Sequence, residues 1–131
     1  MKLRKLCFSL ALVSLAGVAA AQKYRDASTT AIELMQLPKY CHAQYIDEKL
    51  SGDPQYSIQG CGVYTNHFCP GLIRMSRGQK ISLQRDLRRE EIRIAKDAFN
   101  YTLIHMPEKC WLRQDAESAL ARAKMIEASI R

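Results

Sequence analysis

The chain has five cysteines, and the four that lie beyond residue 21 constrain its fold more than any other feature. They are Cys41, Cys61, Cys69 and Cys110, whereas Cys7 lies in the N-terminal stretch that we expect to be an export signal. An even number of cysteines in a short exported chain is typical of a disulfide framework. Four cysteines allow three pairings, and the sequence alone does not choose between them; we expect Cys41 with Cys69 and Cys61 with Cys110. The second bridge would close a loop of about 49 residues and stabilise the fold by about 4 kcal/mol.

Residues 1–21 have the three-part layout of a secretory signal peptide. A basic head precedes an apolar run from Leu6 to Val18, and small residues then lead to Ala21, after which we expect cleavage. The apolar run is too short for a membrane anchor, which needs about 20 residues. A lipoprotein signal would need a cysteine where Gln22 stands. We therefore expect a periplasmic or secreted protein, a single domain over residues 22–131, without a stable membrane anchor after cleavage.

Removal of the signal also changes the net charge. The whole chain has a formal charge of +7, but the part after residue 21 carries 17 basic and 13 acidic residues, and so +4. This mildly basic balance does not indicate nucleic-acid binding. One local basic run has acids at helical ion-pair spacings, which favours a solvated, salt-bridged helix face over a phosphate-binding stripe. The run consists of Arg85, Arg88, Arg89 and Arg93, with Asp86, Glu90 and Glu91 among them.

The first half of the mature chain is rich in cysteine and tyrosine and has little periodicity. We expect residues 22–30 to be flexible, because they are polar and lack an apolar repeat. A short helix, Ala31 to Leu37, should then end at Pro38, which cannot continue the hydrogen-bond ladder. Nothing between Pro38 and residue 65 alternates long enough to predict a strand, so this segment should be irregular.

The second half has the periodicity of helices. The first is expected from Asn66 to Arg77, capped by Thr65 or Asn66 and stopped by Gly78. The longest is expected from a Ser82 cap to His105, before Pro107, and the last from Leu112 to Ala128. The apolar stripe expected on the longest helix consists of Leu83, Leu87, Ile94, Ala95, Ala98, Phe99, Thr102 and Leu103. The face expected on the last helix consists of Leu112, Ala116, Ala119, Leu120, Ala123 and Ile126 or Glu127.

The spacing of Ala95, Phe99, Thr102 and Pro107 resembles the second helix and closing proline of a tetratricopeptide repeat. The residues from Trp111 to Ala128 would then form the first helix of a following unit. The segments Tyr40-Cys41 and Asn66-His67-Phe68-Cys69-Pro70-Gly71-Leu72 are in addition similar to those of small exported bacterial proteins with repeat-like helices. The resemblance to such a protein covers residues 66–128. The resemblance implies a mainly α domain of antiparallel helical hairpins, here stapled by two disulfides, with no catalytic residues to carry over.

A second interpretation of the cysteines is a metal- or thiol-active site. Its candidate residues are Cys41, His42, Cys61, His67 and Cys69. Thiolates and imidazoles are ligands for zinc and copper, but structural zinc sites usually contain close Cys-x2–4-Cys or His-x3–5-His pairs, and no Cys-x-x-Cys motif is present. We therefore favour disulfides, and expect no bound metal or other cofactor.

The sequence contains no signature of a catalytic nucleophile such as Gly-x-Ser-x-Gly, so we do not expect an enzyme. We expect a module that binds a protein partner or associates with itself, since the apolar face of the last helix has no later helix to cover it. A small secreted inhibitor or effector is a further alternative. Aromatic residues close to the cysteines in sequence are the candidates for partner binding. They are Tyr40, Tyr45, Tyr56, Tyr64 and Trp111.

Overall fold

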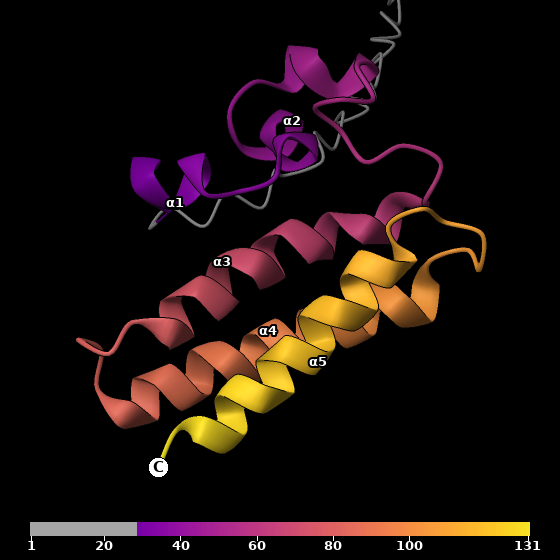
Figure 1. Ribbon diagram of the computed structural model, residues 1–131. Coiled ribbons are helices and arrows are strands. Elements are labelled where there is room, and N and C mark those ends of the chain that lie inside the picture. Colours follow the sequence, from indigo (N-terminus) through magenta and orange to yellow (C-terminus); the bar gives the residue numbers. More distant parts are fainter. Residues whose placement is uncertain (1–28) are drawn as a thin grey trace, which may run out of the picture.

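The structure, a computed structural model, describes residues 29–131, which are mainly helical and contain no strand (Figure 1). The expected signal peptide, residues 1–21, and most of the expected flexible segment, 22–30, lie outside this described part. The α-helices are α1 (Ala31–Met35), α2 (His42–Tyr45), α3 (Phe68–Gln79), α4 (Arg85–His105) and α5 (Arg113–Ser129). Three 3-10 helices join them: η1 (Lys39–Cys41), η2 (Glu48–Gly52) and η3 (Val63–His67).

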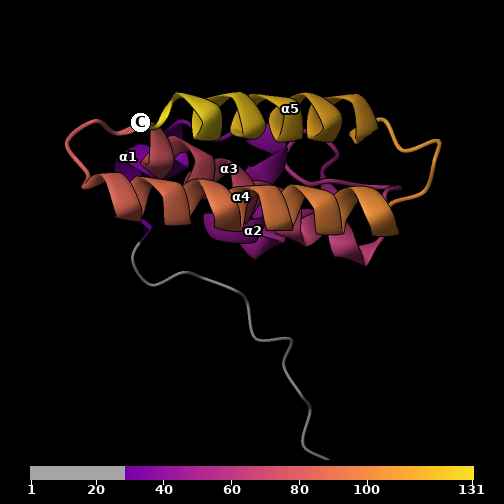
Figure 2. The same cartoon turned by 90° about the horizontal axis from the view of Figure 1, so that it is seen from below.

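The three long helices form the body of the molecule. Successive members run in opposite directions, with α4 packed against both α3 and α5 (Figure 1). The short N-terminal elements lie along α3, and the view in Figure 2 places them behind the layer made by α4 and α5. The molecule therefore has two distinct ends. One carries η3 and the connection between α4 and α5, and the other carries the connection between α3 and α4 together with the end of α5.

The buried stripe of α4 differs in part from the expected one. Ile92, Ala95, Phe99 and Thr102 follow one another at spacings of three and four and are fully buried. The sequence analysis missed Ile92 and included Leu87, which is 51% exposed. The difference arises because the buried face of α4 is set by where α3 lies, and the apolar pattern alone does not give that position.

Two glycines of α3 let it approach α4 closely. A Cβ atom on Gly71 would lie 2.6 Å from Cε1 of Phe99, and one on Gly78 would lie 2.5 Å from Cδ1 of Ile92. The expectation that Gly78 stops the helix was wrong, because Gly78 lies inside α3, which continues to Gln79. Gly78 is needed for the contact with α4 rather than for chain reversal.

The starts of α3 and α4 also differ from the expected ones. A 3-10 helix, η3, precedes α3, so His67 stands at the N-cap and neither Thr65 nor Asn66 caps it. The Thr65 hydroxyl instead donates to the Gly62 carbonyl oxygen at 2.7 Å. Likewise α4 begins two residues after the expected start, with Gln84 at its N-cap in place of Ser82.

The last helix, α5, lies within one residue of the expected range. Leu112, Ala116, Ala119 and Ala123 are buried. The expectation that this apolar face has no helix to cover it was wrong, because earlier helices of the same chain cover it. Alanine side chains allow helices to pack closely, and α5 packs along α4.

The first half, expected to be irregular, consists largely of short α- and 3-10 helices, and two disulfides connect it to the long helices. They pair Cys41 with Cys69 and Cys61 with Cys110, which is the pairing expected from the sequence. The first joins the end of η1 to the first turn of α3, and the second joins the segment before η3 to the connection between α4 and α5. Two such bridges indicate an oxidising, non-cytoplasmic environment, and the mainly helical, doubly bridged fold is confirmed.

A buried carboxylate attaches α1 to the end of α3. The side chain of Glu33 is 4% exposed and accepts hydrogen bonds from Arg77 Nε at 2.9 Å and from Lys80 Nζ at 3.0 Å. It also completes a capping box with Thr30, whose backbone amide donates to Glu33 Oε2 at 3.0 Å. The hydrogen bonds from Arg77 hold the pKa of Glu33 far below its ordinary value, although burial acts in the opposite direction.

We expect Glu33→Gln to lower the free energy of unfolding by about 2 kcal/mol at pH 7, because hydrogen bonds to a charged group are lost. The lowered pKa in the folded state means that the contribution of Glu33 is fully present above its unfolded pKa of about 4.3. It is lost as the pH falls below that value towards the folded pKa. Urea unfolding of both proteins at pH 7 and pH 3 should therefore show a smaller difference at pH 3.

The matched control is Glu90→Gln, which removes an exposed carboxylate that pairs with Arg93. This change should alter the stability much less, because water screens exposed ion pairs. An equal loss in the two variants, or a difference at Glu33 that does not shrink between pH 7 and pH 3, would contradict the structural role of the buried pair.

Candidate protein-binding surface

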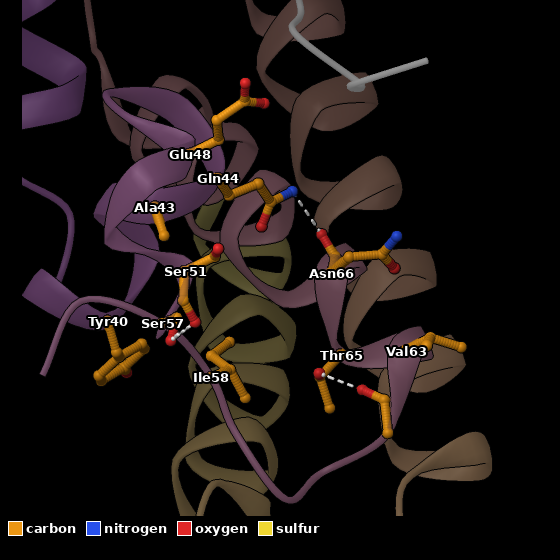
Figure 3. A pocket seen from close by; sticks show the side chains of 11 residues that line it. Tyr40, Ala43, Gln44, Glu48, Ser51, Ser57, Ile58, Val63, Thr65 and Asn66 are labelled. Atoms are coloured by element: carbon orange, nitrogen blue, oxygen red, sulfur yellow. Dashed lines mark hydrogen bonds between the residues drawn. The ribbon is translucent and has the colours of Figure 1, made fainter. Parts of the chain in front are cut away.

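A cavity of about 300 Å³ lies between the N-terminal elements and η3 (Figure 3). We call it the η3 pocket. Its wall combines apolar groups with hydroxyl and amide groups, and α2, η2 and η3 all contribute. The lining residues are Tyr40, Ala43, Gln44, Glu48, Ser51, Ser57, Ile58, Gly62, Val63, Thr65 and Asn66.

Hydrogen bonds across and beside the pocket hold its walls in place. The Gln44 amide donates to the backbone oxygen of Asn66 at 2.8 Å and so connects α2 to η3, as Figure 3 shows. On the opposite wall, the Ser57 hydroxyl lies 2.9 Å from the backbone oxygen of Ser51. Both contacts use backbone oxygens as acceptors, and the first joins two segments that are distant in sequence.

The turn into η3 depends on a glycine and a disulfide. Gly62 has a φ of +79°, a left-handed conformation that favours glycine. It follows Cys61, whose bridge to Cys110 fixes this point of the chain to the connection between α4 and α5. The position of η3, and with it one wall of the pocket, is therefore set by covalent and conformational restraints.

Next to the pocket, η3 contributes two rings to a second feature, which we call the Tyr101 cluster. It consists of Tyr64 and His67 from η3 and of Tyr101 and His105 from α4. The ring centroid of Tyr101 lies 4.2 Å from that of His105, 4.5 Å from that of His67 and 5.9 Å from that of Tyr64. His105 Nδ1 lies 2.8 Å from the Tyr101 backbone oxygen.

The Tyr101 cluster is open to solvent and has apolar neighbours. Tyr64 is 45% exposed and Tyr101 is 37% exposed. Val63 and Ile104, adjacent in sequence to members of the cluster, are exposed by 77% and 76%. The sequence analysis missed Tyr101 and His105 as site residues. Their spacing of four along a helix was the available signal, but their meeting with η3 depends on the tertiary fold.

The third surface feature, after the η3 pocket and the Tyr101 cluster, is the aromatic pair of Tyr40 and Trp111 near the disulfides. Their rings meet edge to face with centroids 5.3 Å apart. The Tyr40 hydroxyl lies 3.4 Å from Asp115 Oδ2, and the indole nitrogen of Trp111 donates to the Gln59 backbone oxygen at 3.1 Å. Burial is the main cause that raises the pKa of Tyr40, so its hydroxyl stays protonated and can donate to Asp115. Trp111 is 52% exposed and remains available to a partner.

The other two expected binding residues lie in different surroundings. Tyr56 stacks on His42 with ring centroids 6.1 Å apart and is half-buried. Tyr45 is buried in the core, so it does not contribute to the surface as proposed from the sequence. The aromatic surface therefore includes Tyr64 and Trp111 from the expected set, with Tyr40 and Tyr56 partly covered.

The alternative metal- or thiol-site residues are engaged in other interactions. Cys41, Cys61 and Cys69 form disulfides, so their sulfur atoms are not thiolates. His42 stacks on Tyr56, and His67 lies against Tyr101. Within residues 29–131, no three His, Cys, Asp or Glu side chains are grouped so that they could hold a metal ion.

The expected salt bridges on α4 are present from Glu90 onwards. Arg93 pairs with Glu90 at 2.6 Å and with Asp97 at 2.9 Å, and Glu91 pairs with Arg74 on α3 at 3.2 Å. The ion-paired face expected from the sequence is thus present only in part. Arg88 and Arg89 bond to backbone oxygens instead of carboxylates, and the pair of Glu91 with Arg74 is partly buried between α4 and α3.

Comparison with known proteins found no protein related to this chain. The chain matches no family model, no curated protein and no solved structure. Across residues 29–131, no helix has the length and apolar character needed to cross a membrane. The functional interpretation therefore rests on the surface features described above.

Proposed function

We propose that the protein is an extracytoplasmic interaction or scaffold module without catalytic activity, located in the periplasm or secreted after removal of residues 1–21. The observation that carries the proposal is the position of η3, which lines the η3 pocket and also contributes two rings to the Tyr101 cluster. A cavity lined by both apolar and polar groups beside exposed aromatic rings has the composition of a protein-binding hot spot.

The size and rigidity of this surface favour a protein partner. A cavity of about 300 Å³ is at the lower limit for small-molecule sites and large enough for one or two side chains of a partner. Tyrosine and tryptophan rings supply contact area with little loss of conformational entropy on binding. The bridge from Cys61 to Cys110 restrains η3 before binding, which lowers the cost of ordering the surface in a complex.

The proposal includes a tetratricopeptide-like relation between α4 and α5. Ala95 and Phe99 are fully buried on α4, and Pro107 follows the end of this helix. These are the places that the repeat family assigns to small and aromatic residues and to its closing proline. Self-association through the same surface is the other form of the proposal.

We expect Val63→Asp to weaken partner binding at least tenfold, because a charge at the rim of the pocket would have to be desolvated in the complex. The partner should first be captured through a photo-crosslinking amino acid at position 63 in the exporting cells. Binding of the purified partner to each variant is then measured by titration calorimetry.

Met125→Asp is the matched control, because Met125 is also exposed, by 74%, but lies on α5. It should leave the affinity unchanged, and a crosslinker at position 125 should not yield the same product. Crosslinking that is equal at the two positions, or affinity that is insensitive to Val63→Asp, would refute the proposed surface. Whether the captured species is an enzyme that the protein inhibits, or a second copy of the chain, is read from its mass and activity.

A further inference from the structure

The end of the molecule opposite η3 combines positive charge with exposed apolar side chains. The stretch 77–89, which ends α3, turns the corner and starts α4, contains five basic residues and one acid. At its tip, Ile81 is 89% exposed, and Leu87 on the first turns of α4 is 51% exposed. We call this region the α3–α4 corner.

The positive charge of the corner is poorly compensated by carboxylates. Arg88 Nε donates to the Gly78 backbone oxygen at 3.1 Å, and Arg89 donates to the Ile130 backbone oxygen at 3.0 Å. These neutral carbonyl oxygens fix the two guanidinium groups at the ends of α3 and α5 without cancelling their charge. Arg93, further along α4, differs from Arg88 and Arg89 because it pairs with two carboxylates.

Of the remaining cations, Arg77 belongs to the buried pair with Glu33, whereas Lys80 and Arg85 are 49% and 60% exposed. Lys80 shares the single carboxylate of Glu33 with Arg77. Arg85 lies 3.7 Å from Asp86, and both side chains are well exposed, by 60% and 87%. Such an exposed pair contributes little, so the segment that contains Ile81 keeps a net positive charge.

We propose that the α3–α4 corner docks onto the surface of an anionic lipid bilayer. The basic side chains would face the lipid phosphates, while Ile81 enters the apolar boundary of the head groups. A bilayer explains both properties of the corner, whereas a soluble anion would explain only the charge. This site is separate from the proposed protein-binding surface, and the failure of either proposal leaves the other intact.

The test is co-sedimentation of the exported protein with vesicles of phosphatidylglycerol and phosphatidylcholine, and with vesicles of phosphatidylcholine alone. Binding should require the anionic lipid and weaken between about 0.05 and 0.5 M salt, because salt screens the attraction. Arg85→Gln should lower the affinity about fivefold, the effect of one cation near an anionic surface. Ile81→Ser should lower it about tenfold through lost apolar burial.

Matched controls come from the opposite end of the molecule. Lys109→Gln removes an exposed cation and Ile104→Ser an exposed apolar residue outside the corner, and both should bind as the unchanged protein does. Equal binding to neutral vesicles would overturn the proposal, as would absence of binding to anionic vesicles at low salt. Competition by inorganic phosphate at constant ionic strength would identify an anion site instead, and would also overturn it.

Discussion

Replacing Phe99 by alanine is expected to lower the free energy of unfolding by about 3–5 kcal/mol, the usual loss for a fully buried phenylalanine. The Phe99 ring lies at the contact between α3 and α4, with its centroid 5.6 Å from that of Phe68. Its removal takes away buried apolar area and leaves a cavity that the helices can close only in part. A small domain is stable by about 5–15 kcal/mol in total, so the variant should unfold at a much lower urea concentration.

The close approach of Gly71 to the Phe99 ring provides a sharper measurement. Gly71→Ala alone should destabilise the protein through overpacking, but in the Phe99→Ala background the added methyl group enters the vacated space. The two losses should therefore fail to add, with a coupling of about 1 kcal/mol or more. Ile104→Ala, an exposed change on the same helix, should have little effect. Additive losses at Gly71 and Phe99 would contradict the packing described for α3 and α4.

Removal of the bridge between Cys61 and Cys110 should destabilise the protein by about 4 kcal/mol. The two cysteines are 49 residues apart, and the constraint that the bridge places on the unfolded chain grows with that separation. Both should be replaced by alanine, so that no free thiol remains to form other disulfides. Urea unfolding measures the loss. Intact mass before and after reduction should show four hydrogens gained by the unchanged protein and two by the variant.

The second bridge supplies the comparison. Cys41 and Cys69 are 28 residues apart, and their removal should cost about 3.5 kcal/mol by the same entropy argument. The two variants should differ more in binding than in stability, since only Cys61 lies next to the turn at Gly62 that leads into η3. A loss below about 1 kcal/mol on removal of the bridge between Cys61 and Cys110 would mean that the unfolded chain is constrained in some other way.

The sequence predicted a helix end or a buried helix face best where a local signal, such as one proline or a row of alanines, determines it. Pro107 follows α4 as expected, and the small residues Ala116, Ala119 and Ala123 indicated the buried face of α5. The first helix, however, ends at Met35, two residues before the expected Leu37, so Pro38 is not what ends it. Gly78 was misinterpreted, because a glycine can either end a helix or allow another helix to come close. Only the close contact of Gly78 with Ile92, which depends on the tertiary fold, shows that this glycine allows close packing and does not end the helix.

The candidate site was less predictable because it depends on contacts between distant segments. The cysteines and Tyr64 pointed to the right part of the chain. Tyr101 and His105, however, meet η3 only after α4 has turned back along α3. The η3 pocket has no motif at all, since its wall includes backbone groups and small side chains such as Ala43 and Ser51.

The length of α4 has a mechanical consequence. Its 21 residues, at a rise of about 1.5 Å each, give a helix about 30 Å long that connects the α3–α4 corner to the Tyr101 cluster. The proposed lipid contact and the proposed protein contact are thus held at opposite ends of one rigid element. A partner bound at η3 and a bilayer bound at the α3–α4 corner would therefore contact the protein about 30 Å apart, so neither would block the other.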